Sequence, residues 1–222
     1  MQSDPVATVI GILLGVGTLL VGVIEYIRAQ VWKRAEFLAD VIKEFESSLP
    51  VRNVLVMLDW EDRKVELFPG MEEPEKRFAR VNDRVFLASM TTHYDDGVRA
   101  GAILAEGEEA VEGEHVAVGV AGARNPTLQF TPVQAAVRDC LDEFLNRLER
   151  FESYVKSNLV SAKDFKPYLR YWLDIIGDPN SGRKFPDLRK QMWRYIDCYK
   201  FTGVQAFFKR FGYTIAPAAS GR

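Results

Sequence analysis

The chain has 222 residues, of which 29 are Lys or Arg and 31 are Asp or Glu, so its formal net charge at pH 7 is −2. This balance excludes a histone-like polycation and a highly charged disordered chain. Two cysteines (Cys140 and Cys198) and two histidines exclude a disulfide-rich scaffold and a multi-histidine metal site, and no C-x-x-C pair is present.

The first predicted element is a membrane-spanning helix within residues 1–27. Residues 6–24 read VATVIGILLGVGTLLVGVI, without a charge, an amide or a proline. At 1.5 Å of rise per residue, this run is about 28 Å long, which matches the hydrocarbon core of a bilayer. A cleaved signal peptide is the alternative, but it needs a basic start and small residues at its end. The chain instead starts MQSDP and continues IEYIRAQVWKR, so the pattern favours an uncleaved single span.

The charges that flank the span predict its orientation. Arg28, Lys33 and Arg34 follow it, and no Lys or Arg precedes it. The positive-inside rule therefore predicts an N-terminus outside the cell and a cytoplasmic C-terminal part. Tyr26 and Trp32 suit the membrane–water interface as anchors, although Trp32 also suits packing on the soluble domain.

Small residues recur along one face of the predicted span. Ala7, Gly11, Gly15, Thr18 and Gly22 are spaced by four, four, three and four residues. Small side chains let two helix backbones approach closely in lipid, so this stripe predicts a homo-oligomer that is joined through Gly11, Gly15, Thr18 and Gly22. The alternative is that glycine is simply common in membrane helices.

Residues 28–60 predict a stalk and the first cytoplasmic helices. No stop signal follows the span, and the apolar positions continue at helical spacing to about Glu46, where serines and Pro50 close the helix. The apolar positions of this stalk are Ile27, Val31, Ala35, Leu38, Ile42 and Phe45. A second, mostly apolar helix is expected over residues 51–60.

Residues 61–131 predict an acidic, glycine-containing insertion that is irregular or contains a little β-structure. Residues 64–68 alternate as a short strand does, and residues 78–90 favour a helix over a strand because their apolar positions have helical spacing. Residues 95–114 hold seven acidic side chains and one Arg. The run HVAVGVAGARN has no helical period and suits either a strand or an ordered loop.

Residues 132–213 predict a C-terminal helical domain, followed by a frayed tail at 214–222. A capping-box pair, Thr131 and Gln134, opens a helix that ends near Asn158. A second pair, Ser161 and Asp164, opens a helix that is too apolar around its circumference to be exposed. Pro186 opens a third helix, and residues 204–212 form a last turn or two. The first of these helices carries a heptad-like apolar stripe of Val133, Val137, Leu141, Phe144, Leu148, Phe151 and Val155.

Basic and aromatic side chains interleave in residues 183–210, which hold eight Lys or Arg and two Asp. Such a pattern binds nucleotides, single-stranded nucleic acid or anionic lipid. The alternative is an aromatic core with a solvated basic face, and a further possibility is that the basic face pairs with the acidic 95–114 segment. The candidate ligand-binding residues are Arg183, Lys184, Arg189, Lys190, Arg194 and Lys200.

The chain lacks the sequence signatures of common enzymes. No P-loop, dinucleotide fingerprint, nucleophile elbow or zincin motif is present. His93 stands beside Tyr94, Asp95 and Asp96, which leaves one possible general base. Cys140 and Cys198 have the surroundings of small buried hydrophobes. We therefore assign no catalytic residue, no metal site and no cofactor.

The span, the stalk WKRAEFLADVIKEFESSLPVRNVLVMLDW and the late segment LERFESYVKSNLVSAKDFKPYLRYWLDII resemble a group of uncharacterised bacterial single-pass membrane proteins with a helical cytoplasmic domain of unknown function. The resemblance covers the two ends of the chain, not residues 61–131. It implies a mainly α protein of the bacterial inner membrane and carries over no catalytic residue.

The sequence thus predicts a membrane-anchored, homo-oligomeric, non-enzymatic interaction or scaffold module with a cytoplasmic protein partner. One alternative is a ligand-gated effector whose cytoplasmic domain binds an anionic nucleotide-type ligand and whose clustered spans perturb the membrane. A second alternative is an enzyme with a site near His93.

Overall fold

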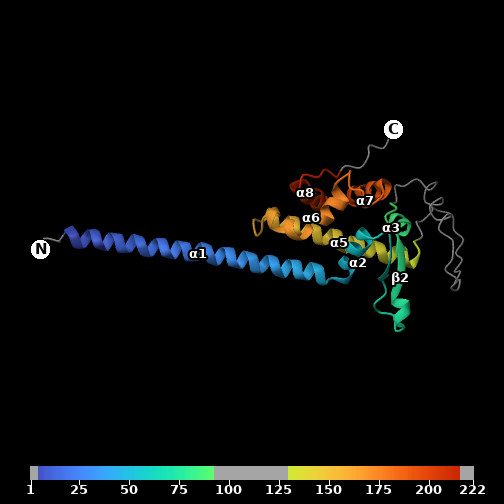
Figure 1. Ribbon diagram of the computed structural model, residues 1–222, viewed down its shortest axis with the longest axis horizontal. Helices are drawn as coiled ribbons and strands as arrows, with labels where there is room; N and C mark the ends of the chain where they lie inside the picture. Colours follow the sequence, from blue (N-terminus) through green and yellow to red (C-terminus); the bar gives the residue numbers. More distant parts are fainter. Residues whose placement is uncertain (1–4, 93–129, 216–222) are drawn as a thin grey trace. The chain divides into compact units, whose positions relative to one another are not determined.

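A computed structural model describes the backbone of residues 5–92 and 130–215, and the side chains within these ranges from residue 14 onward. This part of the chain is mainly helical, with one small antiparallel sheet and a long apolar helix at its N-terminal end, as predicted. The chain divides into two compact units, Met1–Glu44 and Phe45–Arg222. Figure 1 colours the chain in sequence order and labels most of its helices and the strand β2.

The first unit is formed by one helix, α1 (Pro5–Ser47), whose last turn belongs to the second unit. The predicted continuity of span and stalk is confirmed, because the helix runs unbroken through both. Among the described residues, α1 is the one helix long and apolar enough to cross a membrane, and none of its most apolar window is buried.

The second unit begins with a short helix and a β-hairpin. Helix α2 (Leu49–Asp59) is followed by β1 (Asp62–Glu66), a 3-10 turn η1 (Pro74–Arg77) and β2 (Phe78–Asn82). The strands are antiparallel, with Asp62 opposite Asn82 and Glu66 opposite Phe78. The predicted strand at 64–68 therefore exists, but it begins two residues earlier.

The prediction of one helix over residues 78–90 is wrong in its first half. Residues 78–82 form β2, and only Asp83–Ser89 form a helix, α3. The side chain of Asn82 accepts a hydrogen bond from the backbone N–H of Val85 and so caps α3, which sets the break between strand and helix.

Residues 61–92 are the described part of the predicted 61–131 segment, and they contribute Val65, Val81, Phe86 and Met90 to the core. The acidic 95–114 segment, the 115–125 run and both histidines lie outside the described residues.

Helix α5 (Pro132–Lys156) is the central helix of the second unit, and α2, α3 and α8 pack against it (Figure 1). Its capping box is confirmed: the backbone N–H of Gln134 donates to the hydroxyl of Thr131, and the side chain of Gln134 accepts from the backbone N–H of Thr131. Of the predicted stripe, every position except Val133 is buried: Val137, Leu141, Phe144, Leu148, Phe151 and Val155.

Three more helices complete this unit: α6 (Ala162–Gly177), α7 (Pro186–Cys198) and α8 (Thr202–Arg210). The Ser161–Asp164 capping box of α6 is confirmed. The expectation that α6 is buried all round is wrong, because Tyr168 and Tyr171 are exposed on its outer side.

A cluster of phenylalanine rings joins the ends of these helices. Phe151 of α5 lies at its centre, with ring-centroid distances of 5.2 Å to Phe45, 4.7 Å to Phe165 and 6.1 Å to Phe207. Such contacts between buried aromatic rings stabilise a core beyond the area that they bury. The last turn of α1 is therefore anchored to α5, because the ring of its Phe45 packs on Phe144 and Phe151.

Candidate functional site

The six predicted ligand-binding residues separate into two classes. Lys184 and Arg189 are buried, each with 4% of its surface exposed. Arg183, Lys190, Arg194 and Lys200 are exposed. Lys190 pairs with Asp187 one turn earlier on α7, at 3.3 Å.

Arg189 organises the loop between α6 and α7. Its guanidinium donates to the carbonyl oxygens of Pro179 (2.9 Å) and Ser181 (2.5 Å), and at 3.3–3.4 Å to those of Ile175 and Lys184. Burial lowers the pKa of Arg189 from its ordinary value. Within the described chain, no carboxylate forms an ion pair with this guanidinium. The hydrogen bonds from Arg189 to these backbone carbonyls hold the loop in one shape.

Lys184 ties the same loop to the hairpin side of the domain. Its Nζ donates to the Oδ1 of Asp83 (2.5 Å) and to the backbone carbonyl of Trp60 (2.8 Å). Burial raises the pKa of Asp83, and the hydrogen bond from Lys184 opposes this rise. Removing either partner of such a pair leaves a desolvated group without its counterpart, which is strongly destabilising.

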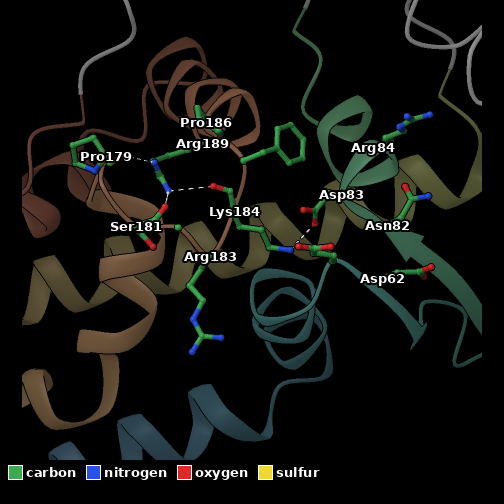
Figure 2. A pocket seen from close by; sticks show the side chains of 13 residues that line it. Asp62, Asn82, Asp83, Arg84, Pro179, Ser181, Arg183, Lys184, Pro186 and Arg189 are labelled. Carbon is green, nitrogen blue, oxygen red and sulfur yellow. Dashed lines mark hydrogen bonds and ion pairs between the residues drawn. The ribbon is translucent and has the colours of Figure 1, made fainter.

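An open hollow of about 640 Å³ lies between this loop and the hairpin. In Figure 2 the Lys184–Asp83 pair lies near its middle, and Arg84 and Arg183 lie on opposite sides of that pair. Phe185 and Pro186, at the start of α7, line it on the loop side, and Asn82 lines it on the hairpin side. Its walls carry four basic and three acidic side chains, and one of the acids, Asp62, pairs with Arg80 outside the hollow. Because Lys184 and Arg189 already donate to groups of the fold, Arg84 and Arg183 are the two lining cations whose exposed guanidinium groups suit a ligand with an anionic group.

The structure thus brings together three of the six predicted residues, Arg183, Lys184 and Arg189, but not Lys190, Arg194 or Lys200. Sequence reasoning missed Asn82 and Arg84, which come from β2 and α3. No local pattern marks these two residues, because they meet the loop only through a fold that joins positions about a hundred residues apart.

A second polar cluster lies where α5, α7 and the end of α3 meet. The guanidinium of Arg138 lies over the rings of Phe130, Tyr195 and Tyr199, at 5.0, 4.7 and 4.8 Å from their centroids. It donates to the carbonyl oxygens of Ser89 and Thr91. This cluster fastens the chain where the first described range ends and the second begins.

The buried hydroxyl of Tyr195 donates to Asp142 at 2.6 Å. Burial and this hydrogen bond raise the pKa of Tyr195. Within the described residues, the buried hydroxyl of Tyr199 has no hydrogen-bond partner. We assign this pair of tyrosines to packing around Arg138.

The described part of the chain contains no group of three or more His, Cys, Asp or Glu side chains placed to hold a metal ion. Cys140 is buried and its pKa is raised by burial, and Cys198 is partly buried, so neither thiol is in the exposed, electropositive setting of a reactive cysteine. His93, the one candidate base, lies outside the described residues.

The predicted oligomerisation face of α1 is open along its length. Gly15, Thr18 and Gly22 line an apolar groove of about 690 Å³ with Leu19, Val23 and Tyr26. A Cβ added at Gly15 or Gly22 would meet nothing within 4 Å, and the hydroxyl of Thr18 is satisfied by the carbonyl of Leu14 at 3.0 Å. Gly11 lies in α1, but its surroundings fall outside the described side chains.

Comparison of the chain with protein-family models, with curated proteins and with solved structures gives no match. Function is therefore argued from the chain's own residues.

Proposed function

We propose that the chain is a membrane-anchored helical interaction or scaffold module that forms homo-oligomers and has no catalytic site of its own. In this proposal α1 crosses the inner membrane of a bacterium once, with its N-terminus outside, and the second unit works in the cytoplasm. The observation that carries the proposal is the exposure of every described side chain of α1 from Leu14 to Ile24.

The transfer free energies of its apolar side chains favour lipid over water around this helix. An apolar side chain moved out of water gains about 1.5–3 kcal/mol. Leu14, Leu19 and Leu20 each leave more than half of their surface open, and the other large apolar side chains up to Ile24 are 46–56% exposed. A run of this kind left in water would lose a free energy comparable to the stability of a whole domain. The three cations Arg28, Lys33 and Arg34 support the proposed orientation.

Fractionation of cells that express the full chain tests the anchor. We expect the chain to sediment with membranes, to resist extraction by alkaline carbonate and to dissolve in mild detergent. A product that stays in the high-speed supernatant, or that is trimmed beyond residue 25, would sink the proposal. Protease treatment of spheroplasts should leave the second unit intact, which tests the orientation.

The open glycine groove supports oligomerisation, since lipid offers no hydrophobic drive and close backbone approach is what joins such helices. Replacing Gly11 and Gly15 by Ile should weaken the oligomer that cross-linking detects in membranes. Gly17→Ile is the matched control, because Gly17 is an equally open glycine outside the stripe. An equal amount of cross-linked oligomer in both variants would show that this face does not join the helices.

A surface where α2 ends supports a protein partner. Trp60 and Tyr171 are exposed, the guanidinium of Arg63 lies 3.8 Å from the centroid of the Trp60 ring, and that of Arg183 lies 5.5 Å from that of Tyr171. The hydroxyl of Tyr171 donates to Asp59, the neighbour of Trp60. Trp, Tyr and Arg are the residue types that dominate the binding energy of protein interfaces. Trp60→Ala should lose a partner that cross-links in native membranes, and Met71→Ala, another exposed apolar residue, should keep it.

The hollow beside Lys184 supports a second candidate, the ligand-gated membrane effector. Its specific support is that three predicted cations line one hollow together with Arg84 and the ring of Phe185, which suits a nucleotide-type anion. A nucleotide that binds only the folded state should raise the melting temperature of the detergent-solubilised chain. Arg183→Gln should abolish this rise and Arg150→Gln, an exposed arginine of α5, should keep it. A rise that survives Arg183→Gln contradicts this assignment.

A further inference from the structure

The apolar surface of α1 does not stop where the uncharged run stops. Beyond Ile24, four large apolar side chains remain exposed: Tyr26 (65% exposed), Ile27 (54%), Val31 (63%) and Trp32 (73%). All four belong to the first unit and lie outside the 19-residue span that the sequence predicts. They surround the helix rather than follow one stripe, because Ile27, Val31 and Trp32 lie about 100°, 140° and 240° around the helical wheel from Tyr26.

Charged side chains are interleaved with these apolar ones. Glu25, Arg28, Lys33 and Arg34 occupy the same two to three turns. An apolar core would exclude such charges, and bulk water would disfavour the exposed tryptophan and its neighbours. The lipid headgroup layer accepts both, since aromatic rings and cations concentrate there.

The dimensions of the helix fit this layer. The 20 residues from Pro5 to Ile24 extend about 30 Å, the thickness of the hydrocarbon core. Trp32 lies eight residues further, so its Cα is about 12 Å beyond Ile24 along the axis. In a helix, Cα–Cβ bonds tilt towards the N-terminus, which is the membrane side here, so the ring of Trp32 lies about one turn closer to the bilayer than its Cα. This depth corresponds to the headgroups.

We propose that residues 25–34 form an interfacial collar that lies in the anionic headgroup layer, with Trp32 as its anchor and with Arg28 and Lys33 bound to lipid phosphates. The proposal rests on the membrane span proposed above. It extends the lipid contact of α1 by about three turns, to residue 34. Of α1, only the turns from residue 35 onward then lie in the cytoplasm, together with the second unit.

Fluorescence of the full chain in vesicles tests the collar. The chain has four tryptophans, so the signal of Trp32 is the difference between the unmodified chain and Trp32→Phe. Lipids brominated close to the headgroup should quench this difference signal most strongly. Lipids brominated deep in the acyl chain should quench it less, and so should acrylamide, a quencher dissolved in the water. Quenching by acrylamide alone would place Trp32 in water and overturn the collar. A signal that resists all three quenchers would show a protein cover, such as a second copy, and would overturn it too.

The contribution of the cations is tested with phosphatidylglycerol, an anionic lipid, brominated near the headgroup. At equal mole fraction, it should quench Trp32 about twofold more than brominated phosphatidylcholine, because basic side chains concentrate anionic lipid around them. Arg28→Gln combined with Lys33→Gln should remove this preference, and Lys43→Gln, nine residues past the collar, should retain it. A preference that survives the double substitution overturns the assignment of the cations. Resistance to carbonate extraction, measured on the same samples, reports on the span alone and separates its failure from that of the collar.

Discussion

The two units use the same apolar residues in opposite ways. Leu19 of α1 is 68% exposed, whereas Leu145 of α5 has no exposed surface. Both residues lie in long, regular helices. The difference shows that apolar content alone does not indicate a core: the periodicity does, because α5 alternates apolar and charged positions and residues 6–24 do not. The apolar face of α5 is covered by other parts of the chain, whereas residues 14–24 of α1 are exposed on every side.

The largest effect on stability is expected from truncating one side chain in each unit. Phe151→Ala removes the central ring of the phenylalanine cluster and should lower the free energy of unfolding of the second unit by about 3–5 kcal/mol, from lost burial and a residual cavity. Leu19→Ala should leave that free energy unchanged, because no side chain of the second unit covers it. Urea titration of the detergent-solubilised chain, followed by circular dichroism, measures both. An equal loss in the two variants would contradict the contrast.

Breaking the loop anchor should have the next largest effect. Lys184→Met removes the cation that holds Asp83 and the carbonyl of Trp60, and we expect a loss of about 3 kcal/mol, since a desolvated carboxylate remains without its partner. The double variant with Asp83→Asn should recover part of this loss. Lys190→Met, which breaks the exposed pair with Asp187, should cost at most about 0.5 kcal/mol and is the matched control.

A smaller effect distinguishes a packed glycine from an open one. A Cβ at Gly177 would lie 2.5 Å from the ring of Tyr213, whereas one at Gly22 would meet nothing within 4 Å. Gly177→Ala should therefore lower the stability of the second unit by about 1–3 kcal/mol, and Gly22→Ala should not. Thermal unfolding in detergent measures the change. Combining Gly177→Ala with Tyr213→Ala should relieve part of the overlap, because the ring contacts at 2.5 and 2.8 Å are removed and the contact with the Cβ of residue 213 at 2.9 Å remains. A cost that adds fully instead would show that the ring is not its cause.

The smallest effect is a pH dependence with opposite signs at two aspartates. Burial raises the pKa of Asp142 above its ordinary value of 3.8, so its contribution to stability is full below pH 3.8 and is lost as the pH rises through the folded-state pKa. The hydrogen bond from Arg80 lowers the pKa of Asp62, so its contribution is present above pH 3.8 and is lost as the pH falls through the folded-state pKa.

Denaturation at a series of pH values checks these signs. The free energy of unfolding of the unmodified chain, relative to Asp142→Asn, should fall as the pH rises above 3.8, by at most about 1.4 kcal/mol per pH unit. Relative to Asp62→Asn, it should fall as the pH drops below 3.8. Slopes of the same sign at both positions would contradict the assigned causes.

The parts of the fold that were predictable are those fixed by neighbours in the chain. The run before Glu25, the capping box at Thr131 and the α5 stripe depend on residues a few positions apart, and the structure confirms each of them. The prediction of a helix over residues 78–82 failed because Phe78 and Val81 have helical spacing, whereas pairing with β1 holds these residues as a strand. Long-range pairing outweighed the local pattern there.

The candidate site was predictable only in composition. Basic side chains near α7 were expected to bind a ligand, yet Lys184 and Arg189 use their donors inside the fold. The partner of Lys184 is Asp83, 101 residues away, and no periodicity reports such a distance. Arg189 bonds to backbone carbonyls, which every residue carries and no sequence pattern marks.

Arg138 has a consequence for engineering. One guanidinium binds the carbonyl of Thr91 and lies over the ring of Phe130, so these two residues, which stand 39 positions apart in the sequence, are held close together. The entropic cost of closing a loop rises only slowly with its length. Two residues that are already held together therefore tolerate inserts of many lengths between them. A fluorescent reporter placed between these two residues would tag the second unit and spare both α1 and the C-terminus.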